Sequence, residues 1–169
     1  MASYGRPTLH EYIPNRLYYV SLSQEPRNSK SAYYFTTDHT LQYWNFFLDF
    51  GPLNLGQSYR FCEKLNSILS DPRHKDKKIY YYSSTHGHKR ANSAAMIAIW
   101  AVMFLGLSAD EAYKPFAKVY PPFPPFHDAS PCVCTYNLSV LDCVRGVYKS
   151  HKLGFLDFKD GSFNIDEYE

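Results

Sequence analysis

Residues 79–101 read IYYYSSTHGHKRANSAAMIAIWA, and this stretch decides the fold. It begins inside the β-prone run Lys78–Ser83, continues as a polar loop from Ser84 to Arg90, and becomes apolar from Ala91 to Leu105. The pattern predicts a buried strand, a loop and a buried helix. The N–H groups of such a loop and of the first helical turn lack helical partners and converge where the helix dipole favours negative charge. The stretch therefore predicts a central strand followed by an anion-facing loop.

The rest of the chain surrounds this unit with further strands and helices. Runs rich in aromatic and β-branched residues predict strands at Arg16–Leu22 and Ala32–Thr37. Helical periodicity predicts helices at Leu53–Leu69 and Thr135–Lys152, and a capping box that begins at Ser108 predicts the start of another. We therefore expect an α/β domain with a central mixed sheet flanked by helices.

The two ends of the chain carry less pattern. Residues 1–14 are polar and broken by prolines, so we expect a flexible lead-in. Gly154 is well placed to end the last helix. The segment Phe155–Glu169 alternates aromatic and acidic residues, and we expect it to return to the sheet as an edge strand. The 169 residues together suit one domain.

Composition indicates the class of protein but does not identify a binding partner. The net charge of +2 gives no reason to expect nucleic-acid binding, and the longest apolar run, Ala94–Leu107, is too short to cross a membrane. The four cysteines follow no secretory signal, which indicates a reducing, intracellular location, and Cys132-x-Cys134 has the wrong spacing for a zinc site. We expect no metal and no cofactor. The sixteen Tyr and twelve Phe predict a core filled with rings or, alternatively, an aromatic binding surface.

Arg90 gives the loop a chemical interpretation. Cysteine-dependent phosphatases place His-Cys, five residues, and then Arg with Ser or Thr in this geometry. If Arg90 takes the arginine position, Ser84 stands at the cysteine position and Ala91 at the hydroxyl position. A thiol becomes a thiolate near neutral pH when cationic surroundings lower its pKa from about 8.5, whereas a serine hydroxyl needs an adjacent general base. His86 and His88 have no evident orienting carboxylate, so the sequence predicts a degenerate active-site loop without catalysis.

The same loop can still be expected to hold an anion. The candidate anion-binding residues are His88, Lys89, Arg90 and Ala91. A guanidinium can grip a phosphate through two parallel hydrogen bonds, which makes Arg90 the most informative of them. Alternatively, Arg90 is a structural residue paired with an acid such as Asp49 or Asp128.

Asp49 is a candidate for the former general-acid position. It precedes Ser84 with one predicted helix between them, and phosphatases of this class carry an acid on a loop before the helix that precedes the catalytic strand. Alternatively, Asp49 caps that helix or bonds the Gly51-Pro52 turn.

Several longer stretches resemble the N-terminal half of the cell-division-cycle-fourteen dual-specificity phosphatases. The matching stretches are Asn15-Arg16-Leu17-Tyr18-Tyr19, Asp49-Phe50-Gly51-Pro52-Leu53-Asn54-Leu55, Lys89-Arg90-Ala91-Asn92, Glu111-Ala112-Tyr113, Pro125-Phe126-His127-Asp128-Ala129-Ser130, Thr135-Tyr136-Asn137-Leu138, Leu141-Asp142-Cys143 and Asp166-Glu167-Tyr168-Glu169. They occur in order and cover nearly the whole chain.

This resemblance implies a single phosphatase-like domain of the cysteine-phosphatase superfamily that has lost catalysis. It implies a C-terminal catalytic phosphatase domain in cis, with residues 160–169 at the start of the interdomain linker. There Asp166, Glu167 and Glu169 are candidates for an acidic groove that favours phosphoserine-proline sites with a downstream basic residue. The family acts on phosphoproteins in mitotic exit and cytokinesis, in the nucleus and cytoplasm, at centrosome, spindle or nucleolus. Some relatives keep a cysteine where this chain has Ser84.

Two functions fit these residues. The first is a non-catalytic domain that supports a catalytic domain and shapes its substrate specificity. The second is a stand-alone pseudophosphatase module that binds phosphorylated ligands. Self-association is compatible with either.

Overall fold

A four-stranded mixed sheet forms one layer of the domain in the computed structural model, which describes residues 5–134 and 136–169. Its strands, in spatial order, are β1 (His10–Ile13), β2 (Leu17–Ser21), β4 (Lys78–Ser83) and β3 (Ala32–Phe35). β2, β4 and β3 are parallel, and β1 is antiparallel to β2. The predicted strand–loop–helix stretch therefore does supply a central strand. β1 lies within the segment 1–14 that the sequence assigns to a lead-in.

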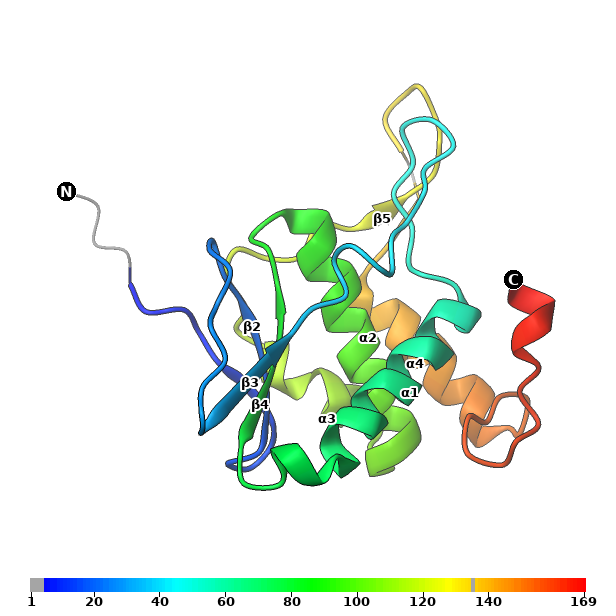
Figure 1. The fold of residues 1–169 in the computed structure, drawn as a ribbon. Helices are drawn as coiled ribbons and strands as arrows, with labels where there is room; N and C mark the ends of the chain where they lie inside the picture. Colours follow the sequence, from blue (N-terminus) through cyan, green and yellow to red (C-terminus); the bar gives the residue numbers. More distant parts are fainter. Residues whose placement is uncertain (1–4, 135) are drawn as a thin grey trace.

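The helices form a second layer beside the sheet (Figure 1). They are α1 (Leu55–Ser70), α2 (Gly87–Leu105), α3 (Ala109–Tyr113) and α4 (Val140–Lys152), with 3-10 turns η1 (Pro72–His74), η2 (Lys114–Phe116) and η3 (Ile165–Tyr168). α2 lies at the centre and contacts α1, α3 and α4. A two-stranded sheet of β5 (Phe126–His127) and β6 (Asn137–Leu138) lies apart from the main one. The α/β class with a mixed sheet and flanking helices is confirmed.

Capping residues set most helix ends. Capping boxes start three of the described helices. The N-cap residue of the box is Asn54 for α1, Ser108 for α3 and Ser139 for α4. The box at Ser108 confirms the sequence prediction. α4 begins at Val140 because Ser139 caps it, later than the predicted Thr135, which lies outside the described residues. Gly154 follows α4 with φ 80°, a left-handed conformation that glycine adopts at little cost.

The sequence predictions for the start of α2 and for the tail are wrong. α2 begins at Gly87 and not at Ala91, because the His86 side chain accepts from the N–H of His88 and caps the helix earlier. The tail does not return to the sheet as an edge strand. Its aromatic rings pack onto α1 instead: Phe158 and Phe163 lie 5.4 and 5.0 Å from the ring of Tyr59, which draws the tail to the helical layer.

Aromatic rings fill the space between sheet and helices, as composition predicted. Tyr19, Tyr81 and Phe61 are at most 1% exposed, and the ring centroid of Tyr81 lies 5.8 Å from that of Tyr19 and 4.8 Å from that of Phe61. Other rings are exposed on a projecting loop, where Trp44 and Phe46 are 82% and 92% exposed. No helix in the described parts of the chain has the length and hydrophobicity to span a bilayer.

Candidate functional site

The candidate site lies where β4 ends and α2 begins. Because α2 starts at Gly87, the connection is only Ser84 to His86, and His88, Lys89 and Arg90 belong to the first helical turn. A helix rotates about 100° per residue, so side chains at three consecutive positions point in different directions. The structure consequently separates candidates that the sequence placed on one loop.

The N–H groups of this connection are largely bound within the protein. The N–H of Ser84 donates to Oδ2 of Asp38 at 2.7 Å, and the N–H of His86 donates to the Ser84 hydroxyl oxygen at 3.4 Å. The N–H of His88 donates to Nδ1 of His86 at 3.3 Å. The N–H groups that the sequence predicted to face an anion are therefore partly occupied by side chains of the protein itself.

Asp38 is a site residue that sequence reasoning missed. Its carboxylate contacts Ser84, its main-chain oxygen accepts from Nζ of Lys89 at 2.6 Å, and its side chain is buried. It follows β3, which is parallel to β4, and the carboxyl ends of neighbouring parallel strands meet at one edge of a sheet. The signal that could have found it is the run Thr36-Thr37-Asp38 directly after a predicted strand.

Two of the predicted anion-binding residues, His88 and Lys89, face a cavity on one side of α2. This cavity of about 320 Å³ is also lined by Asp49, Phe50 and Asn92. The His88 ring stacks on Phe50 with centroids 3.7 Å apart, and burial is the main cause that lowers the pKa of His88. At neutral pH His88 therefore contributes little positive charge to this cavity.

Asp49 organises the projecting loop rather than the start of α1. Its carboxylate accepts from the N–H of Phe47 at 2.7 Å and from the hydroxyl of Tyr43, and these bonds hold the pKa of Asp49 below its ordinary value. The same hydroxyl bond is the main cause that raises the pKa of Tyr43 to about 12. The carboxylate that touches Ser84 belongs to Asp38.

Arg90 points to the other side of the helix. Its Nη2 donates to the main-chain oxygen of Pro121 at 2.6 Å, and the guanidinium lies 5.1 Å from the centre of the Phe123 ring. Within the described residues, neither Asp49 nor Asp128 forms an ion pair with it. The next residue, Ala91, is fully buried in the core. Arg90 is thus separated from His88 and Lys89.

The chemistry available to Ser84 is limited. Its hydroxyl oxygen accepts from the His86 N–H, while Nδ1 of His86 accepts from the helix, so this imidazole nitrogen is engaged in capping. A serine nucleophile needs an adjacent general base that removes its proton. Among the residues that the structure describes, no three His, Cys, Asp or Glu side chains cluster in a way that could hold a metal ion.

The acidic residues of the tail lie at another surface, beside α1. Glu169 forms an ion pair with Arg60, and Glu167 accepts from Nδ2 of Asn164 at 3.2 Å. Asp166 is exposed on the same 3-10 turn, η3. The tail and helices α1 and α4 border a largely apolar cavity of about 570 Å³. These carboxylates are therefore not part of the Ser84 site.

The comparisons with known proteins agree on one family. Residues 11–150 match the family described as "Dual specificity protein phosphatase, N-terminal half". The human "Dual specificity protein phosphatase CDC14A" is 43% identical over 160 residues, which cover 94% of this chain and 27% of that protein. Mouse "Dual specificity protein phosphatase CDC14B" is 37% identical over 157 residues (93% and 32%). The "Tyrosine-protein phosphatase CDC14" of Saccharomyces cerevisiae is 33% identical over 159 residues (94% and 28%). The chain spans less than a third of the length of each of these relatives.

Proposed function

Because this chain belongs to the family formed by the N-terminal half of dual-specificity protein phosphatases, and matches that part of the CDC14 proteins, we propose that it is a non-catalytic domain. On this proposal it supports a catalytic phosphatase domain in cis and helps to shape the choice of phosphoprotein substrates in cell division. The connection from Ser84 to Arg90 is then the degenerate counterpart of a cysteine-phosphatase active-site loop.

The observation that carries the proposal is the set of contacts around Ser84. Position 84 has an oxygen in place of an ionisable sulfur, and the Asp38 carboxylate accepts from its N–H group. Ala91 provides no hydroxyl, and one nitrogen of the Arg90 guanidinium, Nη2, donates to the main-chain oxygen of Pro121. On this proposal both the nucleophile and the hydroxyl are lost, so restoring one of them should not restore catalysis.

The test is an activity assay on the chain with Ser84→Cys. We expect no turnover of an aryl phosphate above that of Ser84→Ala, because a carboxylate beside the new thiol disfavours the thiolate. The pH dependence of alkylation should place the pKa of this thiol at or above its ordinary value of about 8.5. The catalytic domain of a CDC14 relative is the positive control. Turnover by wild-type chain that Ser84→Ala abolishes, or by Ser84→Cys at neutral pH, would contradict the proposal.

The acidic residues of the tail allow a test of the second part of the proposal, that the chain helps to shape the choice of substrates. In a two-domain protein that contains this chain, we expect neutral replacements of Asp166 and Glu167 to reduce the preference for peptides with a downstream Lys or Arg by about fivefold. Exposed charge pairs contribute up to about 1 kcal/mol each. Glu169 should contribute less, because Arg60 already neutralises it.

The measurement for this test is kcat/KM on matched phosphoserine-proline peptides with a downstream Lys or Ala. Arg60→Ala is the matched control, since it frees Glu169 and should strengthen the preference. Unchanged selectivity in the neutralised variant would remove the tail from the substrate groove while leaving the non-catalytic assignment intact.

A further inference from the structure

Arg90 is a buried cation without a carboxylate partner in the part of the chain that the structure describes. The residue is 6% exposed, and it forms none of the ion pairs found there. In the described protein, its side chain donates a hydrogen bond to one neutral acceptor, the main-chain oxygen of Pro121. Burying a charge costs free energy unless other groups compensate for it. A guanidinium has five N–H donors, so the Pro121 carbonyl and the Phe123 ring leave some of them without an acceptor in the described protein.

The guanidinium lies in the wall of a cavity of about 310 Å³ that carries further hydrogen-bond donors. Thr85 and Ser21 line it, together with His10 and Arg6, and none of the described residues that line it is acidic. Burial is the main cause that lowers the pKa of His10, and the charge of Arg90 lowers it further. The cavity therefore carries a positive charge that the described protein does not neutralise.

From this arrangement we infer that the cavity beside Arg90 binds a phosphate group, either inorganic phosphate or the phosphate monoester of a phosphoserine peptide. A guanidinium and nearby hydroxyl groups are suitable donors for phosphate oxygens. The volume lies at the lower end of the range for ligand sites in proteins, so it can admit a phosphate together with part of its ester. Of the connection from Ser84 to His86, Thr85 lines this cavity, whereas the N–H groups of Ser84, His86 and His88 are bound by Asp38, Ser84 and His86. The site does not depend on the proposed supporting role.

The experiment is a titration of the chain with sodium phosphate at constant ionic strength, followed by NMR of the backbone and of the His10 ring. We expect saturable shifts at residues that line the cavity. Arg90→Lys should weaken binding about tenfold, because an ammonium cannot form the two parallel bonds of a guanidinium. Thr85→Glu should abolish measurable binding, because its carboxylate can pair with Arg90. Thr85 is exposed, so this variant should fold normally.

Arg73→Ala is the matched control, since Arg73 is an exposed arginine already paired with Asp71. It should bind phosphate as tightly as the wild type. The same titration with a phosphoserine peptide and its unphosphorylated form identifies the source of the ligand. Equal affinity for phosphate and phosphopeptide indicates a site for the free anion, and tighter binding of the phosphopeptide indicates docking of a phosphoprotein. Absence of saturable shifts with either ligand at millimolar concentration, or undiminished binding by both Arg90→Lys and Thr85→Glu, would overturn the inference.

Discussion

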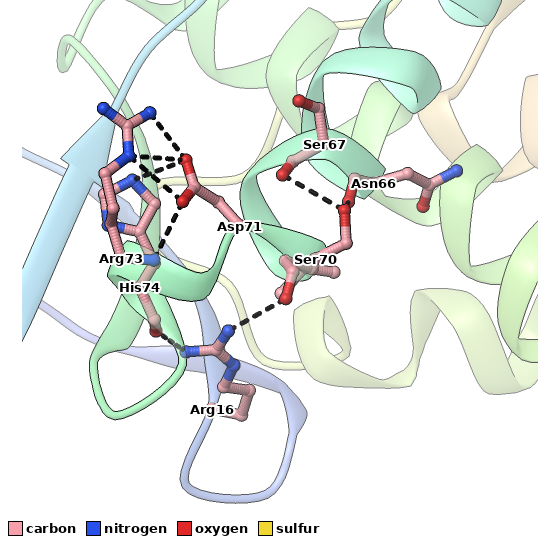
Figure 2. A network of polar contacts seen from close by, with 8 residues as sticks. Arg16, Asn66, Ser67, Ser70, Asp71, Arg73 and His74 are labelled. Atoms are coloured by element: carbon pink, nitrogen blue, oxygen red, sulfur yellow. Dashed lines mark hydrogen bonds and ion pairs between the residues drawn. The ribbon is translucent and has the colours of Figure 1, made fainter.

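Replacing Arg16 with alanine is expected to lower the free energy of unfolding by about 3 kcal/mol. This arginine donates from Nη1 to the main-chain oxygens of His74, at 2.5 Å, and Lys77, and from Nη2 to that of Leu69 at 3.1 Å. Figure 2 shows the guanidinium between the end of α1 and the η1 turn. One side chain thus bonds carbonyls from three segments. Its removal takes the side-chain partner from the carbonyls of Leu69 and Lys77 in a partly buried place, whereas the carbonyl of His74 still accepts from the N–H of Lys77.

The arginine in the same corner provides the control. Arg73 is exposed and pairs with Asp71, so Arg73→Ala should change stability little. Arg16→Lys should recover only part of the loss, because an ammonium cannot reach three carbonyls as a planar guanidinium does. Urea unfolding followed by circular dichroism measures all three variants. Equal effects of Arg16→Ala and Arg73→Ala would show that the carbonyl contacts do not stabilise the fold.

Local signals in the sequence were sufficient for the framework of the fold. β4 spans Lys78–Ser83 as predicted, because its β-prone run is bounded by charged and polar residues. The capping box at Ser108 needs only residues three positions apart, and it was also predicted correctly. The start of α2 was not, because apolar periodicity begins at Ala91 whereas the cap is a histidine side chain at position 86. Histidine is not among the residues that usually mark a helix start.

The composition of the candidate site depended on contacts between distant segments. Asp38 reaches Ser84 only because β3 and β4 are neighbours in the sheet, although they are separated in sequence by α1. Asp49 has the more recognisable sequence context, yet it bonds residues of its own loop. The sequence identified Arg90 as a notable cation, but its direction follows from the early start of α2, which pattern reasoning did not find.

The stability of the sheet is expected to depend on one tyrosine, with Tyr81→Ala lowering the free energy of unfolding by about 4 kcal/mol. Tyr81 is fully buried in β4, with ring centroids 5.0 Å from Phe35 and 4.8 Å from Phe61. Its hydroxyl lies 2.5 Å from the hydroxyl of Thr37, the residue before Asp38. Truncation would leave a cavity and also remove a support of the segment that places the Asp38 carboxylate at Ser84.

Tyr80 is the matched control because it is the adjacent residue and points to the opposite face of the sheet. It is only partly buried and stacks between Tyr18 and Tyr34, with centroids 5.2 and 4.7 Å away, so Tyr80→Ala should cost about 1 kcal/mol. Tyr81→Phe keeps the ring and should also cost about 1 kcal/mol, through the lost hydroxyl bond alone. Chemical denaturation of the three variants separates these contributions. If Tyr80→Ala destabilised the chain as much as Tyr81→Ala, the outer face of the sheet would have to be covered in solution, because a partly exposed ring cannot supply the stabilisation of a fully buried one.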